Sequence, residues 1–93
     1  MHRSADGEAN LVVTPTGAAA LVVRRLGPAP AGKDYEIWVI ENGTPRRAGL
    51  FDRPGVSMLS RRVSRGQTVV VTLEPDGGVD APTGKTLFTA ASI

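Results

Sequence analysis

Residues 34–43 read DYEIWVIENG and decide the fold class, because they predict a β-strand followed by a tight turn. Side chains alternate between the two faces of a strand, and here both faces carry apolar residues. The two apolar sets are Tyr35, Ile37 and Val39 on one face and Trp38 and Ile40 on the other. Such a strand is expected near the centre of its sheet, covered on both sides. Asn42-Gly43 suits a two-residue hairpin turn, since both residues tolerate positive φ.

Short apolar runs separated by Gly, Pro, Asn and Asp continue in both directions from this strand, a rhythm typical of an all-β sandwich or barrel. Seven short strands are expected, at residues 10–14, 18–26, 34–41, 45–51, 57–63, 68–74 and 86–91. In the run at 68–74 the odd-numbered valines and leucine would face the core, with Thr72 and Glu74 on the opposite face. No segment shows a sustained helical period. We predict an antiparallel β-sandwich with immunoglobulin-like character; a closed barrel is the alternative.

The chain has 93 residues, which fits one domain. We expect residues 1–9 to form a flexible N-terminal segment or a cloning remnant, and residues 10–93 to form the single β domain. The longest apolar runs, at 18–23 and 37–40, fall far short of the roughly 20 apolar residues that a transmembrane helix needs. No secretory signal is visible. If the natural protein is membrane-bound, its anchor is expected outside this sequence.

The sequence offers little material for catalysis. It contains no cysteine and its one histidine is His2, so disulfides, Ser–His or Cys–His pairs and zinc sites lack the residues they need. Residues 84–86 (GKT) resemble the end of a phosphate-binding loop, but Val79 stands where that motif needs glycine, and a strand is expected to follow in place of a helix. We therefore predict no enzyme activity, no catalytic residue and no cofactor.

Charged residues are mixed in sign along the chain, and the net charge is only +2. Three arginine pairs stand out: Arg24-Arg25, Arg46-Arg47 and Arg61-Arg62. Gathered on adjacent strands they would suit an acidic partner or phosphates; the alternative is solvated charge that keeps outer faces soluble. The chain has only one Trp, one Tyr and two Phe, too few aromatic rings to stack the bases of single-stranded nucleic acid. Direct nucleic-acid binding is therefore not expected. The carboxylates of Glu74, Asp76 and Asp80 could bind calcium, but their spacing is that of a solvated turn. We therefore predict that they form no metal site.

Two blocks of sequence carry a resemblance to a known family. Residues 27–51 read GPAPAGKDYEIWVIENGTPRRAGLF, and residues 71–84 read VTLEPDGGVDAPTG. In order and separation these blocks resemble the C-terminal domain of the anti-sigma-K factor (RskA-like) family, from about Leu11 to the end of the chain. The matching signature residues are Tyr35, Trp38, Gly49, Phe51, Glu74, Pro75, Gly77, Gly78, Pro82, Thr83 and Gly84. The chain departs from the pattern at residues 57–64, where Arg61 and Arg62 replace a milder Ala- and Leu-rich stretch.

The resemblance implies a regulatory protein on the extracytoplasmic side of the bacterial cell membrane. A cytoplasmic domain would hold a sigma factor, one transmembrane helix would anchor the chain, and both would lie outside this sequence. A site-1 protease and then an intramembrane protease would release the sigma factor for transcription, with this domain as sensor or shield.

The signature residues are expected to serve the fold, the glycines for backbone geometry and Tyr35 and Trp38 for packing. Glu74 is a candidate acceptor for the amides of Gly77 and Gly78. The competing function is a secreted or surface-attached β-sandwich that binds a peptide or carbohydrate. A transmembrane helix upstream in the natural gene would separate the two functions.

Overall fold

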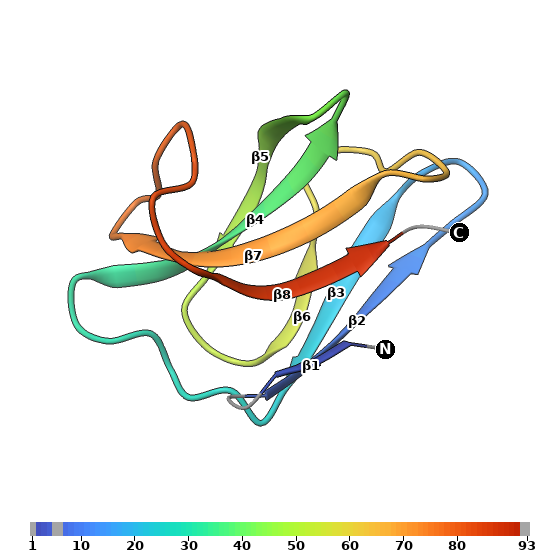
Figure 1. The fold of residues 1–93 in the computed structure, drawn as a ribbon. Helices are drawn as coiled ribbons and strands as arrows, with labels where there is room; N and C mark the ends of the chain where they lie inside the picture. Colours follow the sequence, from blue (N-terminus) through green and yellow to red (C-terminus); the bar gives the residue numbers. More distant parts are fainter. Residues whose placement is uncertain (1, 5–6, 92–93) are drawn as a thin grey trace.

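The computed structural model describes residues 2–4 and 7–91. Within these residues eight strands form two four-stranded antiparallel sheets that lie one over the other (Figure 1). The strands are β1 (His2–Ser4), β2 (Gly7–Val13), β3 (Ala19–Arg24), β4 (Lys33–Glu41), β5 (Thr44–Phe51), β6 (Gly55–Met58), β7 (Thr68–Pro75) and β8 (Thr86–Ala91). One sheet has the order β1-β2-β3-β6 and the other β5-β4-β7-β8. The prediction of an all-β antiparallel sandwich is confirmed.

Strand β4 lies inside its sheet, paired with β5 on one side and β7 on the other, as its two apolar faces predicted. Asn42 and Gly43 have φ values of +52° and +79°, which confirms the predicted hairpin turn between β4 and β5. The ladder with β5 shifts register between Ile37 and Trp38, so β5 carries one extra residue there. Gly49, beside this bulge, has a φ of +143°, a value that side chains rarely tolerate.

The core fills the space between the sheets. Its largest members come from both sheets and from the loops that join them: Leu21, Val23, Leu26, Tyr35, Ile37, Val39, Val63, Val69, Val71 and Phe88. Each large apolar side chain that is fully buried contributes about 1.5–3 kcal/mol. At one end of the core the ring of Tyr35 stacks on Phe51, with centroids 5.0 Å apart, and its hydroxyl donates to the carbonyl oxygen of Gly27 at 2.7 Å. The connection between β3 and β4 is thereby held against the sandwich.

Some strand boundaries differ from expectation. β2 begins at Gly7 rather than at residue 10, because its first residues continue the ladder with β3 as far as the pair Glu8–Arg24. β3 ends at Arg24, since Arg25 has a φ of +57° that breaks the extended backbone. β1 adds a strand within the segment expected to be flexible. Two parts of the chain lie outside the described residues. Met1 and residues 5–6 belong to the expected N-terminal segment, and residues 92–93 belong to the expected domain.

The strand expected at residues 57–63 is wrong in its second half. β6 stops at Met58, and the chain then crosses from one sheet to the other. The amide of Leu59 donates to the carbonyl oxygen of Ala19 in β3, whereas the next amide, of Ser60, donates to Ala48 in β5, each at 2.9 Å. Successive amides that bond to different sheets cannot continue one ladder, so residues 59–67 form a connection.

Candidate functional site

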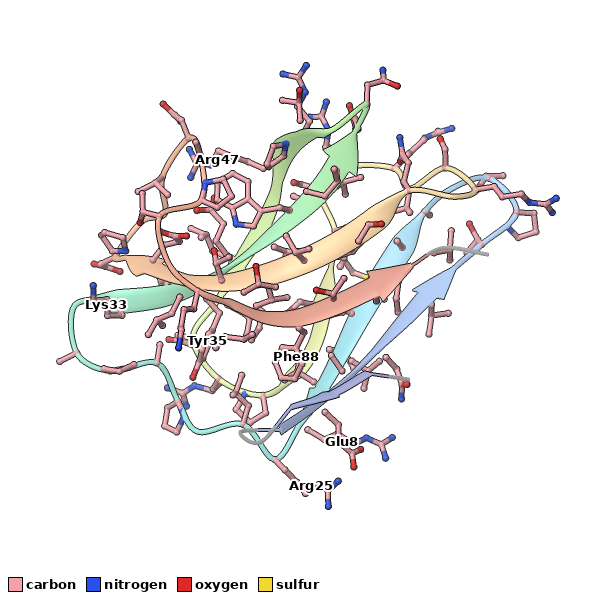
Figure 2. The ribbon with its side chains drawn as sticks, viewed as in Figure 1. Glu8, Arg25, Lys33, Tyr35, Arg47 and Phe88 are labelled. Atoms are coloured by element: carbon pink, nitrogen blue, oxygen red, sulfur yellow. The ribbon has the colours of Figure 1, made fainter. Side chains whose placement is uncertain are left out.

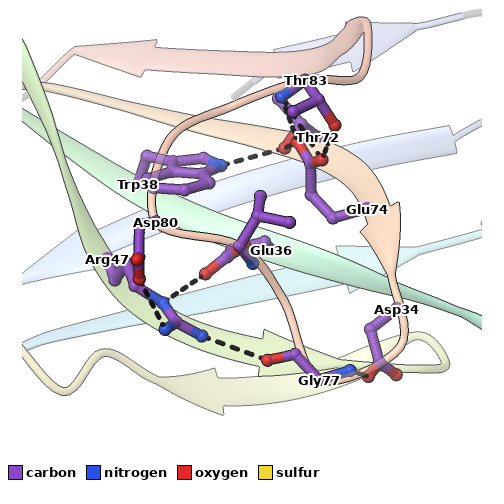
Figure 3. A network of polar contacts seen from close by, with 10 residues as sticks. Asp34, Glu36, Trp38, Arg47, Thr72, Glu74, Gly77, Asp80 and Thr83 are labelled. Atoms are coloured by element: carbon purple, nitrogen blue, oxygen red, sulfur yellow. Dashed lines mark hydrogen bonds and ion pairs between the residues drawn. The ribbon is translucent and has the colours of Figure 1, made fainter.

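The outer face of the β5-β4-β7-β8 sheet is covered by the chain's own connection between β7 and β8, residues 76–85, which we call the strap. Trp38 points away from the core between the sheets, yet none of its surface is exposed, because the strap passes over it (Figure 3). Thr72 and Glu74 share this outer face and are likewise buried, with 1% and 0% of their surface exposed. The predicted alternation along β7 is correct, and the strap explains why its polar face is buried.

Glu74 holds the end of the strap. Its carboxylate accepts hydrogen bonds from the backbone amides of Thr83 at 3.0 Å and Gly84 at 3.1 Å, and from the hydroxyl of Thr83. The hydroxyl of Thr72 donates to the same carboxylate at 2.6 Å and accepts from Nε1 of Trp38 at 2.9 Å. Burial alone would raise the pKa of Glu74, but these hydrogen bonds outweigh it and lower the pKa to about 2. The strap therefore ends on an ionised, fully bonded carboxylate.

Glu36 holds the beginning of the strap. Only 1% of its surface is exposed, and its carboxylate accepts from the amide of Val79 at 2.8 Å and from Nε of Arg47 at 2.9 Å. Arg47 extends the contact, because its Nη2 donates to the carbonyl oxygen of Gly77 at 3.1 Å and its Nη1 reaches Oδ1 of Asp80 at 3.3 Å. These contacts join β4 and β5 to the strap (Figure 3), and Figure 2 shows where Arg47 lies in the whole molecule. A buried carboxylate with a bonded guanidinium is far more stable than either charge left alone.

Two glycines leave the strap no room to move inward. A Cβ on Gly84 would lie 2.1 Å from the carbonyl oxygen of Leu73, so the strap's backbone touches β7 there. A Cβ on Gly78 would lie 2.8 Å from Nη2 of Arg47, and the φ of this residue is +77°. Both positions therefore exclude side chains because the strap packs directly on the sheet.

One predicted contact of the signature residues is wrong. The amides of Gly77 and Gly78 do not bond to Glu74; they donate to Oδ2 of Asp34 at 3.0 Å and to the carbonyl oxygen of Pro75 at 2.9 Å. The reason is geometric: Glu74 points from β7 onto the sheet's outer face, where the far end of the strap returns, whereas the two glycines make the turn beyond the strand's end.

The structure brings most of the signature residues from the two sequence blocks to the strap or to the sheet beneath it. Those on the strap and its contacts are Trp38, Glu74, Gly77, Gly78, Pro82, Thr83 and Gly84. Pro75 ends β7, Gly49 lies at the bulge, and the Tyr35–Phe51 stack lies on the core side. Sequence reasoning did not single out Glu36, and it named Arg47 only as a member of an arginine pair and Thr72 only by its face of the strand. Glu36 was detectable in principle, because a carboxylate two positions from Trp38 on an interior strand shares its face and needs a partner.

Of the six arginines in the three pairs, all but Arg24 contact an acceptor of the protein itself. Arg25 pairs with Glu8, and Arg61 donates to Oε2 of Glu41 at 2.8 Å. Arg61 thereby lowers the pKa of Glu41, with a smaller contribution from Arg46. The sequence's acidic cluster separates in the fold, since Glu74 and Asp80 serve opposite ends of the strap. No group of His, Asp and Glu at the described positions could hold a metal ion.

No helix in residues 2–4 and 7–91 is long and apolar enough to cross a membrane. Residues 84–86 lead into β8, a strand, as predicted against a phosphate-binding loop.

Comparisons with known proteins agree with the two sequence blocks. The family model described as "Anti-sigma-K factor rskA, C-terminal" matches residues 3–86. A Streptomyces griseus protein named "Uncharacterized protein in phr 5'region" is 39% identical over 69 residues, covering 70% of this chain and 29% of that protein. The anti-sigma-K factor RskA of Mycobacterium sp. (strain KMS) is 29% identical over 70 residues, covering 71% of this chain and 29% of its own length.

The chain thus spans less than a third of the curated relatives that it matches. No solved structure matches it. The family model covers both blocks and the whole strap, and the chain belongs to the anti-sigma-K factor RskA C-terminal family.

Proposed function

We propose that this chain is the extracytoplasmic regulatory domain of a membrane-anchored anti-sigma factor. The family match over residues 3–86 carries the proposal. Because the chain covers only 29% of the relatives' length, we assign sigma-factor binding and the transmembrane anchor to the remainder of the full-length protein. In this proposal residues 10–93 form one folded domain. Its regulatory role requires no catalytic residue and no cofactor.

The domain would act as a shield that controls the first proteolytic cut. A protease needs an extended, accessible stretch of chain, and a packed β-sandwich supplies one only when it opens locally. The free energy of local opening therefore sets the basal rate of cleavage, and with it the release of the sigma factor. A ligand that binds only the folded form would lower cleavage further.

The polar strap supports this role. It is one connection outside the two sheets, held by hydrogen bonds to the carboxylates of Glu36 and Glu74 and packed over Trp38, so we expect it to open more readily than the strands of the sandwich. Opening would expose Trp38 and the outer face of β4 and β7. A connection that lies outside the sheets is where a signal that loosens the domain would act first.

An antibody against this domain, applied to fractionated source cells with and without external protease, tests the proposal. We expect a membrane-bound species much longer than 93 residues that external protease cuts. A soluble species of about this size would overturn the anti-sigma proposal for this protein and favour the secreted binding module.

A further inference from the structure

A groove of about 530 Å³ lies at the end of the sandwich where the β2–β3 turn meets the connection after β6. Figure 1 shows these two segments side by side, the turn in blue and the connection in gold. The groove is lined by Val13, Thr14, Pro15, Thr16, Gly17, Val63, Ser64 and Arg65. Its volume falls within the range of about 300–1,000 Å³ that is typical of small-molecule sites.

The two walls of the groove are fixed to each other. The amide of Val63 donates to the carbonyl oxygen of Gly17 at 2.9 Å, and Nη1 of Arg62 reaches the carbonyl oxygen of Thr16 at 3.3 Å. A Cβ on Gly17 would lie 3.2 Å from the carbonyl oxygen of Val63, so the walls are in close contact. The β2–β3 turn is closed by its own bond from the amide of Gly17 to the carbonyl oxygen of Thr14, at 2.9 Å. The groove is therefore formed before any ligand arrives, which lowers the entropic cost of binding.

The lining has a consistent chemistry. Val63 is buried and supplies apolar surface. The hydroxyls of Thr14 and Thr16 are hydrogen-bonded to each other at 3.0 Å, which leaves each of them, like the hydroxyl of Ser64, able to bond to a ligand as well. The only charged residue among the lining residues is Arg65, and no carboxylate or aromatic ring is among them. The groove thus favours a polar ligand with a negative charge and offers no ring for stacking against a neutral sugar.

The guanidinium of Arg65 sets this groove apart from the rest of the surface. Six arginines bond to acceptors of the protein itself: Arg25, Arg46, Arg47, Arg53, Arg61 and Arg62. Among the described side chains, only Arg24 and Arg65 have no such contact, and of these two Arg65 lines this groove whereas Arg24 does not. Arg65 is exposed and lines the same groove as three hydroxyl side chains, and a guanidinium donates two parallel hydrogen bonds to a carboxylate or phosphate group.

We propose that this groove binds a small hydroxylated anion, with Arg65 paired to its carboxylate or phosphate and the hydroxyls of Thr14, Thr16 and Ser64 bonded to its neighbouring oxygens. Anion binding depends on the groove's own residues and not on the control of proteolysis. Each of these two proposals can therefore fail without the other. If both hold, the anion is a ligand that stabilises the folded domain.

Two-dimensional NMR of the ¹⁵N-labelled 93-residue domain, titrated with glucuronate, glucose and inorganic phosphate, tests the site. Glucuronate carries a carboxylate on a polyol, and glucose is its uncharged counterpart. We expect saturable shifts of the Gly17, Ser64 and Gly66 amides with glucuronate, with phosphate or with both, and none with glucose. Binding of one anion alone assigns the ligand to that source.

Arg65→Gln should weaken the binding at least about tenfold, because a charge-assisted hydrogen bond is lost. Arg24→Gln is the matched control and should leave it unchanged, since Arg24 is equally unpaired but lies away from the groove. The proposal is overturned if neither anion gives saturable shifts at the groove, if glucose binds as tightly as glucuronate, or if Arg24→Gln weakens binding as much as Arg65→Gln.

Discussion

The carboxylate of Glu74 accepts a hydrogen bond from the backbone amide of Thr83, 3.0 Å away and nine residues further along the chain. This bond closes the strap over Trp38, and the contacts of Glu36 with Val79 and Arg47 hold the strap's other end. One face of the sandwich is thus sealed by charged hydrogen bonds rather than by a second layer of strands. The strength of these bonds should determine how readily the domain opens.

Replacing Glu74 by Gln should destabilise the domain by about 2 kcal/mol, because the amides of Thr83 and Gly84 lose a charged acceptor in a buried place. Urea unfolding followed by the fluorescence of Trp38, the chain's one tryptophan, measures this. Asp76→Asn is the control: Asp76 is exposed on the same strap, and its replacement should change stability by less than about 0.5 kcal/mol. Equal unfolding midpoints for Glu74→Gln and the native chain would contradict the account.

Stability should fall in acid because of Glu74. Its pKa is lowered from 4.5 to about 2 in the folded chain, so its contribution is complete above pH 4.5 and is lost as the pH falls toward 2. Urea midpoints measured from pH 7 to pH 2 should show this loss. In Glu74→Gln the decline should be shallower, leaving the contribution of the other carboxylates. An identical pH profile in the two proteins would exclude Glu74 as its source.

Arg47→Ala should destabilise the domain by about 2 kcal/mol or more, because it leaves the buried carboxylate of Glu36 without its cation. Its neighbour offers a matched control. The side chain of Arg46 is exposed and lies 3.9 Å from Glu41, so Arg46→Ala should cost less than about 1 kcal/mol. Thermal unfolding of the two variants measures these losses of stability. Similar losses in both variants would show that Arg47 contributes no more to stability than a surface charge does.

Gly84→Ala should destabilise the domain by about 1–3 kcal/mol, since the new methyl would overlap the carbonyl oxygen of Leu73 and push the strap off β7. Gly27→Ala is the comparison, because a Cβ there meets nothing within 4 Å. Hydrogen exchange should place the change in Gly84→Ala at the amides of Thr83 and Gly84. Native-like protection of those two amides in this variant would show that the strap does not need the close approach.

The sequence predicts those parts of the fold that depend on local patterns. Alternation along residues 34–41 and 68–74 identifies β4 and β7, and Asn42-Gly43 identifies the turn after β4, because a strand's period and a turn's φ values are properties of adjacent residues. The connection at 59–67 escapes prediction, since Leu59 and Ser60 bond to different sheets and nothing in their own sequence indicates this.

The strap and the groove depend on contacts between distant residues. The signature block marks Glu74 and Thr83 together, but only the folded chain shows that the one bonds to the other and that Gly77 bonds instead to Asp34. The groove joins Thr16 to Arg65, and strands β3 to β6 lie between these two residues in the sequence. Long-range hydrogen bonds have no period, so pattern reasoning identifies the residues without their partners.

Cleavage of the full-length protein in its source cells, in the absence of signal, is the most direct test of the proposed shield. Trp38→Ala and Glu74→Gln loosen the domain by different routes, through lost packing and through a lost charged acceptor, while Asp76→Asn is expected to leave it intact. The account predicts that the extracytoplasmic fragment accumulates several-fold more in the first two, in the order of their measured instability, and not in the control. Unchanged cleavage in variants shown by unfolding to be destabilised would contradict the claim that the folded domain guards the chain.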